Sequence, residues 1–192
     1  MFTRVVIDYG HGWDGDVWTD GGEVDACDRW GREFEDRLRI TGLPIEVLNT
    51  RKRPGITQEQ REEWIDPNDL VLHLHVGVPK ANRAPRQSGT VYLNREDVTP
   101  LGIAICDALD AWIRQSGVDY SQKSKVMGAK FPWFVHRGTS IQIEPFVIGS
   151  HGSQVLEMRF QHLASVLCEV IWSYMVAQNP VLKSRFHRCV ER

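Results

Sequence analysis

The stretch Asp69-Leu-Val-Leu-His-Leu-His75 decides the fold class of this chain. It is apolar along almost its whole length, which is typical of a strand that is covered on both faces inside a parallel sheet. The run Arg4-Val-Val-Ile-Asp8, which Gly10 and Gly12 interrupt, predicts a second buried strand that leads into a loop. Strands of this kind need helices above and below them, so we expect helical segments between them.

Helical periodicity does separate these strands. Apolar residues at helical spacing indicate a first helix: Cys27, Trp30, Phe34 and Leu38. Gly42 follows them, and glycine commonly ends helices. Thr57 and Gln60 have the spacing of a helix start in which side chain and backbone cap each other. A second strand is expected at residues 44–48, between these two helices.

The second half of the chain continues the alternation. We predict strands at residues 89–93, 131–135 and 140–146, and a helix at residues 100–113. Residues 116–130 are expected to form a loop. One long helix is expected at residues 153–177. The pattern predicts the α/β class: a single domain with a mostly parallel twisted sheet of about six strands, flanked by helices on both faces.

Net charge, hydropathy and cysteine spacing bear on which partners and which location are expected for this chain. The 192 residues carry a formal net charge of -2, so no global attraction to nucleic acid is expected. No run is apolar enough to span a membrane, and no signal peptide is visible. We therefore expect a cytoplasmic location, or an extracellular one if a leader has been removed. The four cysteines form no Cys-x-x-Cys pair and are expected to be buried, reduced thiols: Cys27, Cys106, Cys168 and Cys189.

Ionisable residues follow several of the predicted strands. His11 comes just after the first strand, His75 ends the strand at 69–75, and Glu144 closes the run Ile141-Gln-Ile-Glu144. Glu23 begins the first helix. If the strands are parallel, these side chains meet at the carboxyl edge of the sheet, where α/β proteins bind ligands.

Two imidazoles and a carboxylate form a common catalytic zinc set, in which water completes the coordination. His11, Glu23 and His75 fit the ligand roles, and a second carboxylate, Glu144, fits a general acid/base. Rivals exist for three of these four positions, and spacing alone leaves them open. They are Asp20 and Asp25 for Glu23, His73 for His75, and Glu157 for Glu144.

A family resemblance supports the same four residues. Val5-Val-Ile-Asp-Tyr-Gly-His-Gly12 resembles the opening of the zinc-dependent N-acetylmuramoyl-L-alanine amidases of the amidase-3 type. Asn49-Thr-Arg51 is similar to the Thr-Arg signature of that family, and the stretch 69–75 is similar to its strand that ends in a ligand His. Ser140-Ile-Gln-Ile-Glu-Pro-Phe146 resembles its late strand, which carries the catalytic Glu. The resemblance covers roughly residues 3–178.

Three positions depart from the family pattern. Trp13 stands where a second Gly is usual, His73 stands where Ser precedes the ligand His, and Gly77 replaces the usual Asn. These departures concern the surroundings of the metal rather than its ligands, and such surroundings orient the ligands.

The resemblance implies a peptidoglycan hydrolase that binds Zn²⁺ and cleaves the amide bond between N-acetylmuramic acid and L-alanine. Glu144 would take a proton from the attacking water and pass it to the leaving nitrogen. We expect a catalytic domain at residues 1–178, a basic C-terminal tail at 179–192, a monomer, and no nucleic-acid or integral-membrane partner. Without a visible leader or wall-binding repeat, a phage endolysin that acts on the cell wall from the cytoplasm at lysis is expected.

Two other classes are compatible with the same residues. One is a different zinc amidohydrolase or carboxypeptidase that acts on a small acylated substrate. The other is a degenerate, non-catalytic domain that binds the cell wall, which Trp13 and Gly77 would suit.

Overall fold

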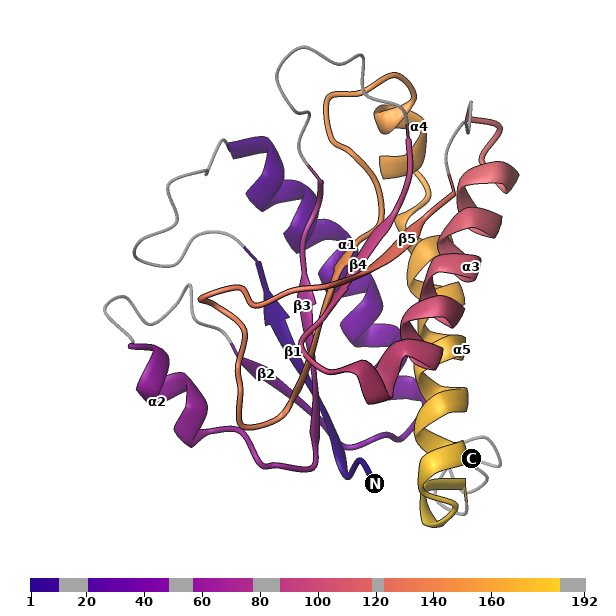
Figure 1. The fold of residues 1–192 in the computed structure, drawn as a ribbon. Coiled ribbons are helices and arrows are strands. Elements are labelled where there is room, and N and C mark those ends of the chain that lie inside the picture. The colour runs from indigo at the N-terminus through magenta and orange to yellow at the C-terminus, as the bar shows by residue number, and fades with distance from the viewer. Residues whose placement is uncertain (11–20, 49–56, 78–86, 119–122, 184–192) are drawn as a thin grey trace.

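The computed structural model describes residues 1–10, 21–48, 57–77, 87–118 and 123–183. In chain order the elements are β1 (Arg4–Tyr9), α1 (Gly21–Ile40), β2 (Ile45–Leu48), α2 (Gln58–Glu63), β3 (Asp69–Leu74), β4 (Thr90–Leu93), the 3-10 turn η2 (Glu96–Val98), α3 (Thr99–Gln115), β5 (Lys125–Gly128), β6 (Thr139–Glu144), α4 (Ser153–Glu157) and α5 (Phe160–Gln178). Figure 1 shows their arrangement in space.

The strands form one sheet with the order β2-β1-β3-β6-β4-β5. Strands β2, β1, β3 and β6 are parallel to one another. Strand β4 is antiparallel to β6, and β5 follows β4 in parallel. The predicted α/β fold with a mostly parallel sheet of six strands is therefore confirmed. Because β1, β3 and β6 are adjacent and parallel, their carboxyl ends lie at one edge of the sheet.

The two faces of the sheet are covered unequally. Helices α1, α3 and α5 pack on one face and enclose the larger core, in which Trp30, Phe34 and Trp112 are fully buried. The opposite face holds a smaller apolar cluster of Val6, Leu48, Ile65, Val71 and Val135, with the short helix α2 beside it (Figure 1). This thinner face also carries the polar side chains described below.

Several local predictions are confirmed. Thr57 and Gln60 form the expected reciprocal cap at the start of α2. Gly42 adopts a φ of 73° just after α1, a left-handed conformation that glycine takes without steric cost. Three of the cysteines are buried, namely Cys27, Cys106 and Cys168, whereas Cys189 lies outside the described residues.

Two predictions about residues 116–135 were wrong. Residues 125–128 form β5 rather than a loop; this edge strand is largely exposed, so its sequence shows no apolar alternation. Residues 131–135 form turns instead of a strand. Their aromatic rings stack on one another over the sheet, with Phe131 and Trp133 centroids 4.5 Å apart. Aromatic residues favour strands, but here packing against the sheet face competes with pairing.

The expected long helix at 153–177 is divided into α4 and α5. The break occurs at Arg159, whose φ of -115° and ψ of 22° are not helical. Arg159 is held by α3 on both sides: its guanidinium donates to the carbonyl of Gln115 (2.7 Å), and its own carbonyl accepts from Trp112 (3.3 Å). These tertiary bonds interrupt a sequence that is helical in its periodicity.

The end of the described chain packs against the body. Asn179 and Leu182, which lie within the predicted tail, are both buried, and Leu182 joins the larger core. Residues 184–192 lie outside the described residues. No helix in the described part of the chain has the length and hydropathy to cross a membrane.

Candidate active site at the carboxyl edge of the sheet

The ends of β1, β3 and β6 bring three residues into one row. The amide of Gly10 donates to the carbonyl of Leu74 (2.8 Å), and the amide of His75 donates to the carbonyl of Ile143 (3.0 Å). These bonds extend the parallel pairing by one residue beyond each strand. Gly10 and His75 thus directly follow β1 and β3, and Glu144 is the last residue of the neighbouring strand β6. Side chains alternate along a strand, so His75 and Glu144 lie on the same face as the smaller apolar cluster.

The row is closely packed around His75. A Cβ atom on Gly10 would lie 2.4 Å from Cδ2 and 2.5 Å from Nε2 of the His75 ring, far inside van der Waals contact. Any residue other than glycine at position 10 would therefore clash with the His75 ring in its present position. At the other end of the row, a Cβ on Gly77 would lie 3.4 Å from Oε2 of Glu144. The glycine that departs from the family pattern is thus adjacent to the predicted catalytic carboxylate.

Glu144 is oriented by a neighbour that the sequence did not single out. Nε2 of Gln142 donates to Oε1 of Glu144 (2.8 Å), and Nε1 of Trp133 donates to Oε1 of Gln142 (2.8 Å). The Trp133 ring also stacks over His75, with centroids 6.3 Å apart and planes 27° apart. Gln142 could have been found from its spacing, since residues two apart on a strand share a face. Trp133 could not, because residues 131–135 were expected to form a strand.

Tyr92 is a further neighbour of Glu144. It is paired with Gln142 across the β4–β6 ladder. Burial, together with the negative charge of Glu144, raises the pKa of Tyr92 to about 12. The phenol therefore stays protonated at any pH near neutrality and can only donate a hydrogen bond or accept one as a neutral group.

Beneath the row lies a buried polar network. Asp8 accepts from Nδ1 of His73 (2.8 Å) and forms an ion pair with Arg61 of α2. Nε2 of His73 lies 3.2 Å from Oγ of Ser140, which donates to the carbonyl of Val135 (2.7 Å). Burial works to raise the pKa of Asp8, but the His73 hydrogen bond and the Arg61 charge outweigh it and lower that pKa below its usual value.

This order of Ser, His and Asp has the chemistry of a nucleophilic triad, but its place in the fold excludes that role. Ser140 and His73 are fully buried and Asp8 is 5% exposed, so no substrate can reach the hydroxyl. His73 also stacks on Phe134, with centroids 5.2 Å apart. His73 is therefore a fully buried histidine of the core. Through these hydrogen bonds and the ion pair, the network links β1, β3, β6 and α2 next to the site.

The predicted metal ligands are only partly described. Glu23 lies in the first turn of α1 and is 4% exposed, whereas its rival Asp25 is exposed. His11, the other rival Asp20, Trp13 and the stretch 49–51 lie outside the described residues. Among the residues that are described, no three His, Cys, Asp or Glu side chains are grouped closely enough to hold a metal ion. The structure places His75 and Glu144 at the ends of the neighbouring strands β3 and β6. The predicted ligand set also includes His11.

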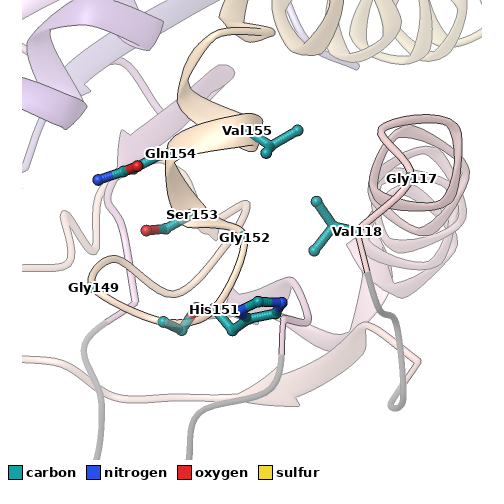
Figure 2. A pocket seen from close by; sticks show the side chains of 9 residues that line it. Gly117, Val118, Gly149, His151, Gly152, Ser153, Gln154 and Val155 are labelled. Carbon is teal, nitrogen blue, oxygen red and sulfur yellow. The ribbon is translucent and has the colours of Figure 1, made fainter.

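The last rival, Glu157, and two other histidines lie elsewhere. Glu157 is on α4, where it pairs with Arg29 of α1 (3.1 Å). His136 is exposed at the surface. His151 borders a separate pocket of about 500 Å³ between the end of α3 and the start of α4 (Figure 2). None of these residues shares the row of His75 and Glu144.

Comparison with known proteins supports the fold. No protein-family model matches the sequence, and no curated protein matches it. Solved structures do match over nearly the whole chain. One is the N-acetylmuramoyl-L-alanine amidase AmiC2 of Nostoc punctiforme, with a TM-score of 0.69, 17% identity, and coverage of 90% of this chain and 96% of that one.

Two other matches are catalytic domains. The first belongs to CwlV, an N-acetylmuramoyl-L-alanine amidase from Bacillus (Paenibacillus) polymyxa var. colistinus, with a TM-score of 0.67, 13% identity, and coverage of 91% and 98%. The second belongs to the CD27L endolysin that targets Clostridia difficile, with a TM-score of 0.67, 16% identity, and coverage of 89% and 97%. At these identities the comparisons establish a common fold.

Proposed function

We propose that this chain is a zinc-dependent peptidoglycan hydrolase that cleaves the amide bond between N-acetylmuramic acid and L-alanine. The observation that carries the proposal is the row at the carboxyl edge of the sheet, where His75 and Glu144 end adjacent parallel strands. An imidazole beside a carboxylate at this edge suits metal-assisted hydrolysis. The shared fold with amidase catalytic domains favours this bond as the target.

The side chains proposed as ligands are of the types that bind zinc. The proposed ligands, His11, Glu23 and His75, supply the nitrogen and oxygen donors that zinc prefers. Gly10 leaves space for the His75 ring that any side chain would fill. Glu23 is a buried carboxylate, 4% exposed, in the first turn of α1. When bound, zinc would lower the pKa of a water molecule and polarise the carbonyl oxygen of the substrate.

The protein's own groups then carry the proton. Glu144 accepts the proton of the attacking water and delivers it to the alanine nitrogen as the amide bond breaks. Gln142 holds Oε1 of that carboxylate through the bond described above. Trp133 stacks on the ring of His75. The buried ion pair of Asp8 and Arg61 holds helix α2 against strand β1 next to this row.

The test is digestion of purified peptidoglycan by the zinc-loaded protein, with a chelated sample beside it and mass spectrometry of the products. Free stem peptides that begin at L-alanine, with intact glycan strands, would support the amidase. Cleavage inside the peptide would make the enzyme a peptidase. No product from any wall type would refute the proposal and favour a non-catalytic wall-binding domain or a small acylated substrate.

Variants assign the roles. Glu144→Gln should lower the rate about 10²- to 10⁴-fold while zinc remains bound, because only the acid/base is lost. His75→Ala should lose zinc, as measured by elemental mass spectrometry. Glu157→Gln is the matched control, since that carboxylate pairs with Arg29 away from the row and its loss should leave the rate unchanged. Equal activity of Glu144→Gln and Glu157→Gln would exclude Glu144 as the acid/base.

A further inference from the structure

A chain of two hydrogen bonds leads from the aromatic segment over the sheet to the carboxylate of Glu144. We infer that Trp133 and Gln142 form a relay that holds this carboxylate in one orientation, so both are positioning residues for the hydrolysis. The inference rests on the proposed function for the role of Glu144. It does not depend on the identity of the metal.

The direction of the relay follows from donor chemistry. An indole N–H can only donate, so the atom of Gln142 that faces Trp133 must be its oxygen. The amide NH₂ group of Gln142 is then obliged to face Glu144, and it donates to Oε1 at 2.8 Å. Turning the amide over would place its nitrogen against the indole donor and its oxygen against a carboxylate, and both bonds would be lost. Trp133 thereby sets the orientation of an amide that could otherwise adopt either one.

Burial makes this orientation costly to abandon. Gln142 is 2% exposed, and a buried amide without hydrogen-bond partners is strongly unfavourable. Its backbone is fixed on both sides, because it pairs with His73 on β3 and with Tyr92 on β4. Gln142 is thus a buried polar residue in the middle of the sheet, at a position where an aliphatic side chain would need no hydrogen-bond partners.

The indole itself is clamped. Trp133 stacks on the ring of Phe131, with planes 8° apart and centroids 4.5 Å apart, and also on the ring of His75, with centroids 6.3 Å apart. One side chain thus contacts a proposed metal ligand through its face and the acid/base through its N–H and Gln142. The relay fixes the two groups relative to each other, and proton transfer depends steeply on such positioning.

Two substitutions remove the hydrogen bonds of the relay. Trp133→Phe keeps an aromatic ring next to Phe131 and His75 but lacks the donor. Gln142→Met keeps the length of the side chain but lacks the amide. Each should lower kcat about 10- to 100-fold, as expected for the loss of a hydrogen bond to a charged group, with KM and zinc content unchanged. The double variant should be no slower than the slower single variant, because both act on the same bond chain.

Trp112→Phe is the matched control. It also loses an indole N–H bond, to the carbonyl of Arg159 (3.3 Å), but in the larger core on the other face of the sheet. It should lower the melting temperature and leave kcat unchanged. Wild-type kcat in both Trp133→Phe and Gln142→Met, or a loss of kcat in Trp112→Phe as large as theirs, would overturn the inference.

A spectroscopic measurement separates the relay from the activity. In a ¹H–¹⁵N spectrum, the indole signal of Trp133 is identified by its absence in Trp133→Phe. Gln142→Met should move that signal upfield, since its hydrogen-bond acceptor is gone, and Glu144→Gln should move it less. An indole signal that Gln142→Met leaves in place would overturn the relay. If the wild-type protein releases no peptide from any wall, the proposed function fails, and this spectrum alone then decides whether the relay exists.

Discussion

Gly10→Ala is the most informative single substitution at the edge of the sheet. The added methyl group would lie 2.4 Å and 2.5 Å from two atoms of the His75 ring and 2.5 Å from the carbonyl oxygen of Leu74. Ordinary carbon contacts lie at about 3.5–4 Å, so the overlap is roughly 1 Å at each of three atoms. The carbonyl of Leu74 accepts a hydrogen bond from the amide of Gly10, so it cannot move away from residue 10 without breaking that bond. Either β1 or the imidazole must move.

The expected effects on stability and on activity differ in size. Overpacking of this kind costs about 1–3 kcal/mol, which for a domain of this length lowers the melting temperature by about 2–12 °C. A misplacement of a catalytic group by about 1 Å costs roughly 10²-fold in rate. Peptide release from purified wall, measured well below the melting temperature of the variant, should therefore fall far more than the folded fraction does.

Gly31→Ala is the control for this substitution. Its methyl group would also approach to 2.4 Å, against the ring of Tyr9 in the larger core on the opposite face. It should change the melting temperature and leave the rate alone. A Gly10→Ala variant that retains wild-type activity, or a Gly31→Ala variant that loses as much activity, would refute the reasoning that Gly10 exists to seat His75.

Other predictions follow from buried groups. Asp8→Asn should cost about 3–5 kcal/mol in urea unfolding, because it removes the negative charge beside the buried guanidinium of Arg61. Since folding lowers the pKa of Asp8, its contribution is present above about pH 4 and is lost as the pH falls; the wild type should therefore lose more stability than Asp8→Asn between about pH 5 and pH 2, and equal losses would contradict this. The pKa of Tyr92 is raised to about 12, so Tyr92→Phe should leave the alkaline limb of the activity profile unchanged up to about pH 10. Burial raises the pKa of Cys106 to about 12 and that of Cys168 to about 11; iodoacetamide at about pH 8 should label neither in the folded protein, and peptide mapping would reveal any exception.

Much of the architecture could be predicted from local patterns. The apolar runs at β1 and β3 and the helical spacing in α1 identify a parallel α/β sheet, because burial on both faces requires uninterrupted apolar strands. The same runs place His75 and Glu144 at strand ends, and parallel strands must end at the same edge. Burial of His73 could also be predicted, since it lies inside an apolar strand.

Residues whose structure depends on distant partners were not predictable in this way. Strand β5 is short and largely exposed, with only Val126 packed against the core, and it is identified by its pairing with β4. The aromatic residues near 131–135 have the composition of a strand, yet they stack over the sheet. The helix break at Arg159 is imposed by bonds to α3, and no local signal marks it.

The sequence by itself determined the α/β class, the approximate ends of β1 and β3, and the two described side chains of the row, because burial and alternation are local properties of the chain. Only the tertiary structure decided how Glu144 is oriented. Trp133 comes from a segment that joins no strand, and its N–H meets Gln142 only after the chain has turned back across the sheet. A hydrogen bond between residues nine apart on different elements depends on relative placement to a fraction of an ångström, and pattern and propensity carry no information at that scale.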